Sequence, residues 1–162
     1  MRVSVYIKTR LPLIKMTLRI PEYKFDLKTP EFRKTDDEFE IWFLEGVLER
    51  YPVYVECLLF LGNLYTANEM YEKGLKVDVK LSKLKPCDPV VNYNLACSYS
   101  LLGSVNKALE FLGKAIDLGY NDIKHLENDS DLDRLRDEEG YRMLINKLKK
   151  SVKKLVEQNP MD

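Results

Sequence analysis

The sequence of 162 residues carries 26 basic and 26 acidic side chains, so its formal net charge at neutral pH is zero. Its 45% hydrophobic and 32% charged residues are typical of a folded globular chain and exclude an intrinsically disordered one. Its apolar runs stay well short of the roughly 20 residues that cross a bilayer, which argues against a membrane-spanning protein.

The charges are distributed unevenly along the chain. Residues 1–35 have nine Lys/Arg against three Asp/Glu, residues 36–140 have 11 against 21, and residues 141–162 have six against two. The three parts therefore carry charges of +6, −10 and +4. Basic ends on an acidic body predict contact of the ends with that body or with acidic partners, and solvated ends on an ordinary domain are the alternative.

Residues 1–34 are predicted to form an extended, basic N-terminal arm. Val3, Val5 and Ile7 alternate with more polar residues, which is the period of a strand. Each proline favours an extended conformation in the residue before it, and three prolines divide the arm: Pro12, Pro21 and Pro30. Basic residues interrupt the apolar stretch that a signal peptide needs: Lys8, Arg10, Lys15 and Arg19. Met16 is an alternative start, because the pattern before it connects to nothing later.

A first helix is predicted from Thr35 to about Arg50. Thr35 and Glu38 form a capping box, in which each side chain accepts a hydrogen bond from a free N–H group at the start of the helix. The helix stops before Pro52, which cannot continue it. Its apolar side chains cover more than one face, so we expect packing on two sides and place Trp42 in the core.

A pattern in the middle of the chain repeats after 34 residues. Leu58-x-x-Leu61-Gly62-x-x-Tyr65 is matched by Asn92-x-x-Leu95-Ala96-x-x-Tyr99. The spacing i, i+3, i+4, i+7 places each set on one helix face. Gly74 and Ala108 supply later small residues at the same interval, so we expect close packing of the second helix of each unit on the first. Helices are predicted over residues 52–66, 69–84, 89–102 and 104–118, with four residues as caps: Asp88, Gly103, Ser104 and Gly119.

This period and its Leu-Gly/Ala-x-x-Tyr core resemble the tetratricopeptide repeat, a helix-turn-helix unit. The resemblance implies an all-α, right-handed solenoid with a half-repeat over residues 35–52 and full repeats over 53–86 and 87–120. The chain departs from the family where Leu58 and Asn92 replace a large aromatic residue, and again at Asp78 and Leu112.

The resemblance also implies a binding groove lined by the first helix of each repeat. Its lining residues would be Leu59, Asn63, Thr66, Tyr93, Asn94, Cys97 and Leu101. Asn63 and Asn94 match two asparagines with which some relatives clamp the terminal carboxylate of chaperone tails. Leu59 stands where that clamp needs a lysine, and a carboxylate without a cation loses its hydration uncompensated. We therefore reject the clamp and expect the asparagines to bind the backbone of an extended peptide.

After Tyr120 the repeat ends, and residues 121–158 are predicted to form a terminating cap. The Asp-x-Asp-Leu-x-x-Leu-Arg run resembles the element that follows the last repeat in many bacterial tetratricopeptide proteins. A basic helix is expected from about Glu138 to Gln158. The inner face of the cap would consist of Leu132, Leu135, Tyr141, Leu144, Ile145 and Leu148, with six Lys/Arg outside.

Signals for chemistry are weak. Asp129, Asp131 and Asp133 have the spacing of the first calcium ligands in an EF-hand, but Arg134 stands where that loop needs glycine and Gly140 where it needs glutamate. We therefore expect no metal site. His125 is the only histidine, and neither a phosphate loop nor a nucleophile elbow is present, so the sequence predicts no enzyme and no cofactor.

Three cysteines, Cys57, Cys87 and Cys97, have neither metal nor disulfide spacing, which favours reduced thiols in a cytoplasmic protein. The function expected is a non-catalytic adaptor or scaffold that holds a protein or peptide partner in the groove. Self-assembly through the repeat faces into a homo-oligomer is the alternative. Contact of the basic ends with nucleic acid or membrane is a further alternative, which is disfavoured because the C-terminal helix has no aromatic residue for base stacking apart from Tyr141. The extended arm is itself a candidate ligand of the groove.

Overall fold

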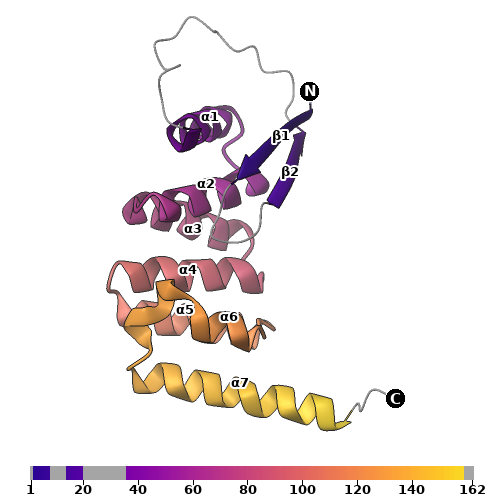
Figure 1. The fold of residues 1–162 in the computed structure, drawn as a ribbon, viewed down its shortest axis with the longest axis vertical. Coiled ribbons are helices and arrows are strands. Elements are labelled where there is room, and N and C mark those ends of the chain that lie inside the picture. The colour runs from indigo at the N-terminus through magenta and orange to yellow at the C-terminus, as the bar shows by residue number, and fades with distance from the viewer. Residues whose placement is uncertain (1, 8–13, 20–35, 159–162) are drawn as a thin grey trace, which may run out of the picture.

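The structure is a computed structural model that describes residues 2–7, 14–19 and 36–158. Two short strands precede a stack of helices (Figure 1). The helices are α1 (Asp36–Arg50), α2 (Val55–Ala67), α3 (Tyr71–Leu84), α4 (Pro89–Leu101), α5 (Val105–Asp117), α6 (Ile123–Asn128) and α7 (Glu139–Gln158). A short 3-10 helix, η2 (Ser130–Leu135), connects α6 to α7.

The helices form a layered solenoid. Helix α2 packs against α3 and α4 against α5 as two hairpins, and α3 joins the hairpins by packing against α4. Helix α1 packs on α2 at one end, and α7 packs on α5 at the other. The predicted helical solenoid is therefore confirmed.

The residues of the repeated pattern form the core of the stack. Both sets, Leu58-Leu61-Gly62-Tyr65 and Asn92-Leu95-Ala96, are buried, and Tyr99 is half-buried. Trp42, which the sequence predicts in the core, is half-buried and packs against the cluster that α1 and α2 share. Cys57 and Cys97 are buried free thiols, and Cys87 is exposed.

Two of the predicted helix starts are a few residues too early. Helix α2 begins at Val55 rather than Pro52, because Tyr54 has an extended backbone with φ −73° and ψ 98°. Helix α3 begins at Tyr71 rather than Glu69, because Glu69 has a left-handed φ of 59° that a right-handed helix cannot include.

Most of the predicted caps are confirmed. The Asp88 side chain accepts hydrogen bonds from the N–H groups of Val90 and Val91, at 2.9 and 3.1 Å. Gly103 and Gly119 have positive φ angles of 72° and 105°, as expected for left-handed residues at helix ends. Ser104 occupies the N-cap position of α5 but makes no capping hydrogen bond through its side chain, so only its position is as predicted. The predicted cap at Thr35 lies outside the described residues.

The described parts of the N-terminal arm form a hairpin. Strand β1 (Arg2–Ile7) pairs antiparallel with β2 (Ile14–Arg19), and Val5 lies opposite Met16. The alternation of apolar residues predicted the first strand. The partner strand was not predicted, because its pairing depends on a contact between separate segments. The remainder of the arm lies outside the described residues.

Candidate interaction surface

The predicted groove residues of α2 lie on one helix face and remain accessible. Asn63 is exposed, and Leu59 and Thr66 are half-buried. Leu59 packs against a buried cluster of Leu58, Leu81 and Val91, which joins α2 to α3 and α4. Helix α2 therefore presents an amide, a hydroxyl and part of an apolar side chain.

The predicted groove residues of α4 divide into two groups. Asn94 and Leu101 are half-buried and keep part of their surface accessible. Tyr93 and Cys97 are buried, with only 4% and 7% of their surface exposed. A partner in the groove would therefore have little access to Tyr93 or Cys97 in this structure.

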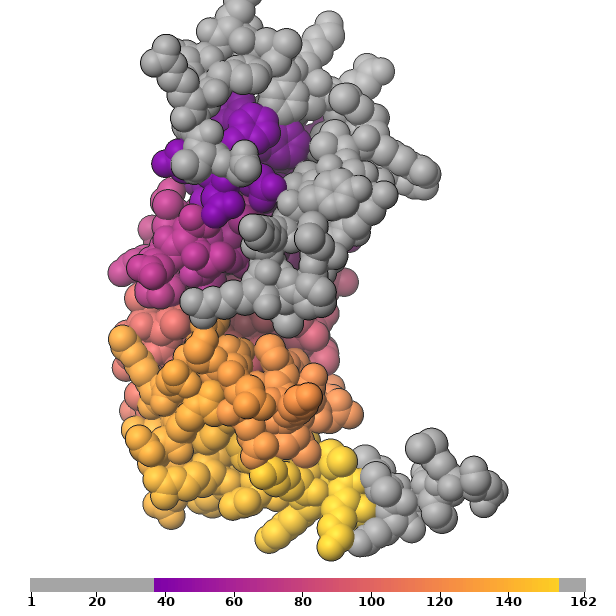
Figure 2. Space-filling model, viewed as in Figure 1, coloured from indigo at the N-terminus to yellow at the C-terminus, as the bar shows by residue number. Residues whose placement is uncertain are grey.

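Tyr93 and Cys97 are covered by α6 and η2, which form the first part of the predicted terminating segment. We call these two elements the cap. Residues of the cap lie on one face of the stack, in orange in Figure 2, and η2 packs against α4. The Tyr93 hydroxyl donates a hydrogen bond to Asp129 Oδ2, and Cys97 Sγ lies 3.8 Å from the same oxygen. The Tyr93 ring stacks on Tyr120 with 4.2 Å between ring centroids. Residues of the chain itself, Tyr120 and Asp129, therefore occupy part of the predicted groove.

The surroundings of the Tyr93 hydroxyl and the Cys97 thiol keep both groups protonated and neutral. Burial raises the pKa of Tyr93 and of Cys97, and the nearby Asp129 carboxylate raises both further. A buried thiol with a raised pKa is a poor nucleophile, because the thiolate is the reactive form. The cluster therefore attaches the cap to α4, and its thiol is not activated as a nucleophile.

The acidic residues near the cap have structural roles. Ligand atoms of Cys97, Asp129 and Asp131 lie within 4.8 Å of one another, a spacing that a metal ion could occupy. Asp129 Oδ1, however, accepts a hydrogen bond from the Asp131 N–H at 3.0 Å, and Oδ2 accepts one from Tyr93. Asp133 points elsewhere and pairs with Arg136 at 2.8 Å. The three aspartates thus do not converge as an EF-hand would require.

One accessible residue was missed at the sequence level. Val90, near the start of α4, is 49% exposed and lies one helical turn before Asn94. Its position four residues before Asn94 could have identified it. We define the α2–α4 strip as six accessible residues of these two helices, the accessible predicted groove residues together with Val90: Leu59, Asn63, Thr66, Val90, Asn94 and Leu101.

Stacked helical hairpins that end in a cap define the class of this protein as a tetratricopeptide-like helical solenoid. No family model matches the chain. Within the described residues, no helix is both long and apolar enough to cross a membrane.

Solved structures with a similar fold include two of the protein MamA. MamA 41-end from Desulfovibrio magneticus RS-1 superimposes with a TM-score of 0.60 at 20% identity, over 78% of this chain and 70% of that one. MamA MSR-1 C2 superimposes with a TM-score of 0.56 at 18% identity, over 72% of this chain and 69% of that one. At these identities the likeness concerns the fold alone.

A curated relative is similar in sequence. A chloroplastic protein of Arabidopsis thaliana is 32% identical over 93 residues, which are 56% of this chain. The match spans only 28% of the length of that protein. The likeness therefore covers a module within a much longer chain.

Proposed function

We propose that this protein is a non-catalytic interaction module that binds an extended segment of a protein partner along the α2–α4 strip. The main support is that this strip stays accessible while neighbouring Tyr93 and Cys97 are covered by the cap. Asn63 and Asn94 offer amide donors and acceptors that fit a peptide backbone, and Leu59 and Val90 offer apolar contact. The three free cysteines suit a reducing compartment such as the cytoplasm.

Site-specific photo-crosslinking tests this proposal. A photo-reactive amino acid placed at position 63 or 94 should crosslink the same partner protein from a cell extract. The matched control is position 110 on α5, where Glu110 is exposed but belongs to the second helix of its hairpin. Equal crosslinking from position 110, or different partners from 63 and 94, would contradict a binding surface on the strip.

Self-association is a second candidate, and the exposed end of α1 favours it. Phe39 is 40% exposed, and its ring lies 5.8 Å from Trp42 and 6.5 Å from Phe43. A terminal helix of a solenoid with exposed aromatic surface is suited to packing on another copy. Light scattering after size-exclusion chromatography should then give a dimer mass that Phe39→Ser reduces to that of a monomer. A monomeric unsubstituted protein would eliminate this candidate.

A further inference from the structure

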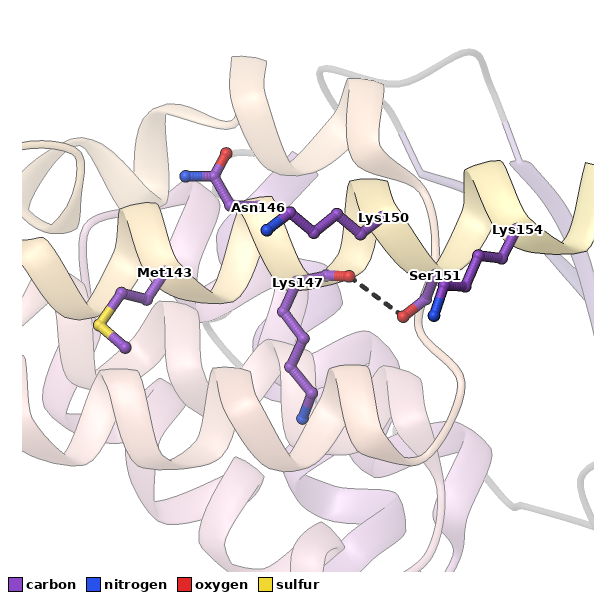
Figure 3. Close-up of a pocket in the computed structure, with 6 residues that line it drawn as sticks. All are labelled: Met143, Asn146, Lys147, Lys150, Ser151 and Lys154. Carbon is purple, nitrogen blue, oxygen red and sulfur yellow. Dashed lines mark hydrogen bonds between the residues drawn. The ribbon is translucent and has the colours of Figure 1, made fainter.

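The outward face of α7 carries a shallow, basic hollow at the end of the solenoid. The hollow measures about 430 Å³ and is lined from this helix alone by Met143, Asn146, Lys147, Lys150, Ser151 and Lys154 (Figure 3). These positions recur every three or four residues, so they form one stripe along the helix. We call them the α7 stripe. The opposite face of α7 is buried through Tyr141, Ile145 and Leu148.

The stripe carries more lysines than there are carboxylates paired with them in the described residues. Lys147 pairs with Asp117 at 2.9 Å. Lys150 and Lys154 are exposed, and neither makes an ion pair among residues 37–154, whose side chains the structure describes. Met143 is 65% exposed at the other end of the stripe, so an apolar contact adjoins the lysines.

The residues of the stripe restrict the class of partner that it can bind. Insertion into a membrane is unfavourable, because the apolar face of α7 packs inward on the core. Single-stranded nucleic acid needs stacking aromatic residues, and the stripe has none. A second copy of α7 would place lysines against lysines. Duplex nucleic acid or lipid headgroups would match the lysines alone, whereas a carboxylate-bearing protein segment can complement both the lysines and the exposed Met143.

The spacing of the lysines favours a helical segment. With a rise of about 1.5 Å per residue, Lys147, Lys150 and Lys154 follow one another at about 4.5 and 6 Å along the axis. Lys147 belongs to this spacing because its pair with Asp117 is solvent-exposed on both sides, and such a pair is weak enough to be exchanged for another carboxylate. Carboxylates three and four residues apart on a partner helix have the same separations. Side chains on one face of an extended strand recur at about 6.6 Å, which does not match the shorter interval.

We propose that the α7 stripe docks an acidic amphipathic helix of a protein partner. Carboxylates of that helix would pair with Lys150 and Lys154 and would replace Asp117 at Lys147, and an apolar side chain would cover Met143. Methionine suits such a contact because its flexible side chain adapts to different neighbours. This site is separate from the α2–α4 strip and does not depend on the function proposed for it.

Fluorescence anisotropy with the full chain and designed probes tests the proposal. The first probe is a labelled alanine-rich helix with one leucine and with glutamates three and four residues apart on one face. The second has the same composition with the glutamates spread around the helix. At about 0.15 M salt, where exposed charges are partly screened, the striped probe should bind about tenfold more tightly than the scrambled one. Equal affinities would overturn the proposal.

Charge-reversal variants test whether the striped probe binds at the α7 stripe. Lys150→Glu with Lys154→Glu should weaken binding of the striped probe about tenfold or more, since attraction becomes repulsion. The control is Lys83→Glu with Lys85→Glu, two exposed lysines at the end of α3. Circular dichroism checks that both variants fold, and Met143→Ser provides a milder test if the reversal unfolds α7. Equal loss in the control would overturn the proposal.

Two other probes test whether the partner belongs to a different class of anion. Duplex DNA and phosphatidylserine vesicles carry negative charge without the spacing of an acidic helix. Both should bind more weakly than the striped peptide at the same salt concentration. Tighter binding of DNA or vesicles, lost in Lys150→Glu with Lys154→Glu, would assign the stripe to that anion and overturn the protein partner.

Discussion

At Gly62 the lack of a side chain lets α2 and α3 pack closely. A Cβ atom added to Gly62 would lie 3.2 Å from Asp78 Oδ1 and 3.5 Å from Val77 Cγ1. On the other helix, a Cβ at Gly74 would lie 3.8 Å from the carbonyl oxygen of Gly62. Glycine in a helix costs about 1 kcal/mol relative to alanine, and the close packing of α3 accounts for its presence here.

We predict that Gly62→Leu destabilises the protein by about 1–3 kcal/mol, because the larger side chain has no space between α2 and α3. Gly62→Ala should have a much smaller effect, since Asp78 needs to move by only a few tenths of an ångström while alanine improves helix propensity. Urea unfolding followed by circular dichroism measures both variants. An unchanged midpoint for Gly62→Leu would mean that the helices do not approach closely at this residue.

Asp78 is a buried carboxylate at a position where the resemblance implies an aromatic residue. It is 5% exposed, and Ser98 Oγ donates a hydrogen bond to Oδ2 at 2.5 Å. Burial raises the pKa of Asp78 from 3.8 to about 6, although the hydrogen bond from Ser98 lowers it. Because the folded-state pKa lies above the unfolded one, the ionised carboxylate destabilises the fold above about pH 6, and protonation relieves this cost as the pH falls toward 4.

We therefore predict that Asp78→Asn stabilises the protein at pH 7 by about 1–3 kcal/mol, since it removes a buried charge but keeps a polar group for Ser98. The advantage of the variant should shrink between pH 6 and pH 4, where the aspartate becomes protonated. Urea unfolding of both proteins across this range measures the difference. Parallel stability curves would show that Asp78 has an ordinary pKa.

At the scale of the elements, the cap is the part that distinguishes this solenoid from a plain pair of repeats. Leu126, Leu132 and Leu135 of α6 and η2 are fully buried against the second hairpin. Arg136 donates to the carbonyl oxygen of Asp129 at 2.8 Å, and the Tyr141 hydroxyl donates to that of Leu126. The cap therefore combines an apolar inner face, packed on the second hairpin, with polar contacts that connect its turns to each other and to α7.

We predict that Tyr93→Phe destabilises the protein by about 1–3 kcal/mol, because Asp129 loses a buried hydrogen-bond donor. Tyr99→Phe is the matched control on the same helix, since no hydrogen bond of the Tyr99 hydroxyl occurs within the described residues. Thermal unfolding compares the two variants. Amide exchange in η2 should also increase in Tyr93→Phe, and protection equal to that of the unsubstituted protein would show that the bond does not hold the cap.

For the whole molecule, the basic arm and the acidic repeats form a complementary pair. Residues 1–35 carry +6 and residues 36–140 carry −10. Attachment next to α1 gives the arm an effective concentration of roughly millimolar near the α2–α4 strip, so even a weak affinity would suffice for occupancy. We propose that the arm competes with an outside partner for this strip, either in its own chain or in a second copy.

Deletion of residues 1–34 should therefore tighten partner binding or dissociate a dimer, and Asn94→Ala should reproduce part of this effect. Amide exchange of the intact protein provides an independent measurement. Protection is expected in the arm, and it should weaken at high salt if charge attraction contributes. Amide exchange throughout residues 1–34 at the rate of an unfolded peptide would contradict this proposal and would show that the arm is a tail without contacts.

The sequence by itself determined the repeated part of this protein. The helix face of Leu58, Leu61 and Tyr65, the caps at Asp88 and Gly103, and the inner face of α7 were all predicted correctly. These features depend on side chains within a few turns of one another, so the order of residues contains the information. The recurrence after 34 residues then implied stacking of the same units.

Only the tertiary structure decided which groove residues remain accessible. Tyr93 and Cys97 have the register of a binding surface, yet Asp129, more than 30 residues later, covers both. That contact depends on the path of α6 and η2 after the repeat ends, and no periodic pattern encodes this path. The pairing of β1 with β2 has the same origin, because a strand is stabilised by hydrogen bonds to a segment that its own sequence does not specify.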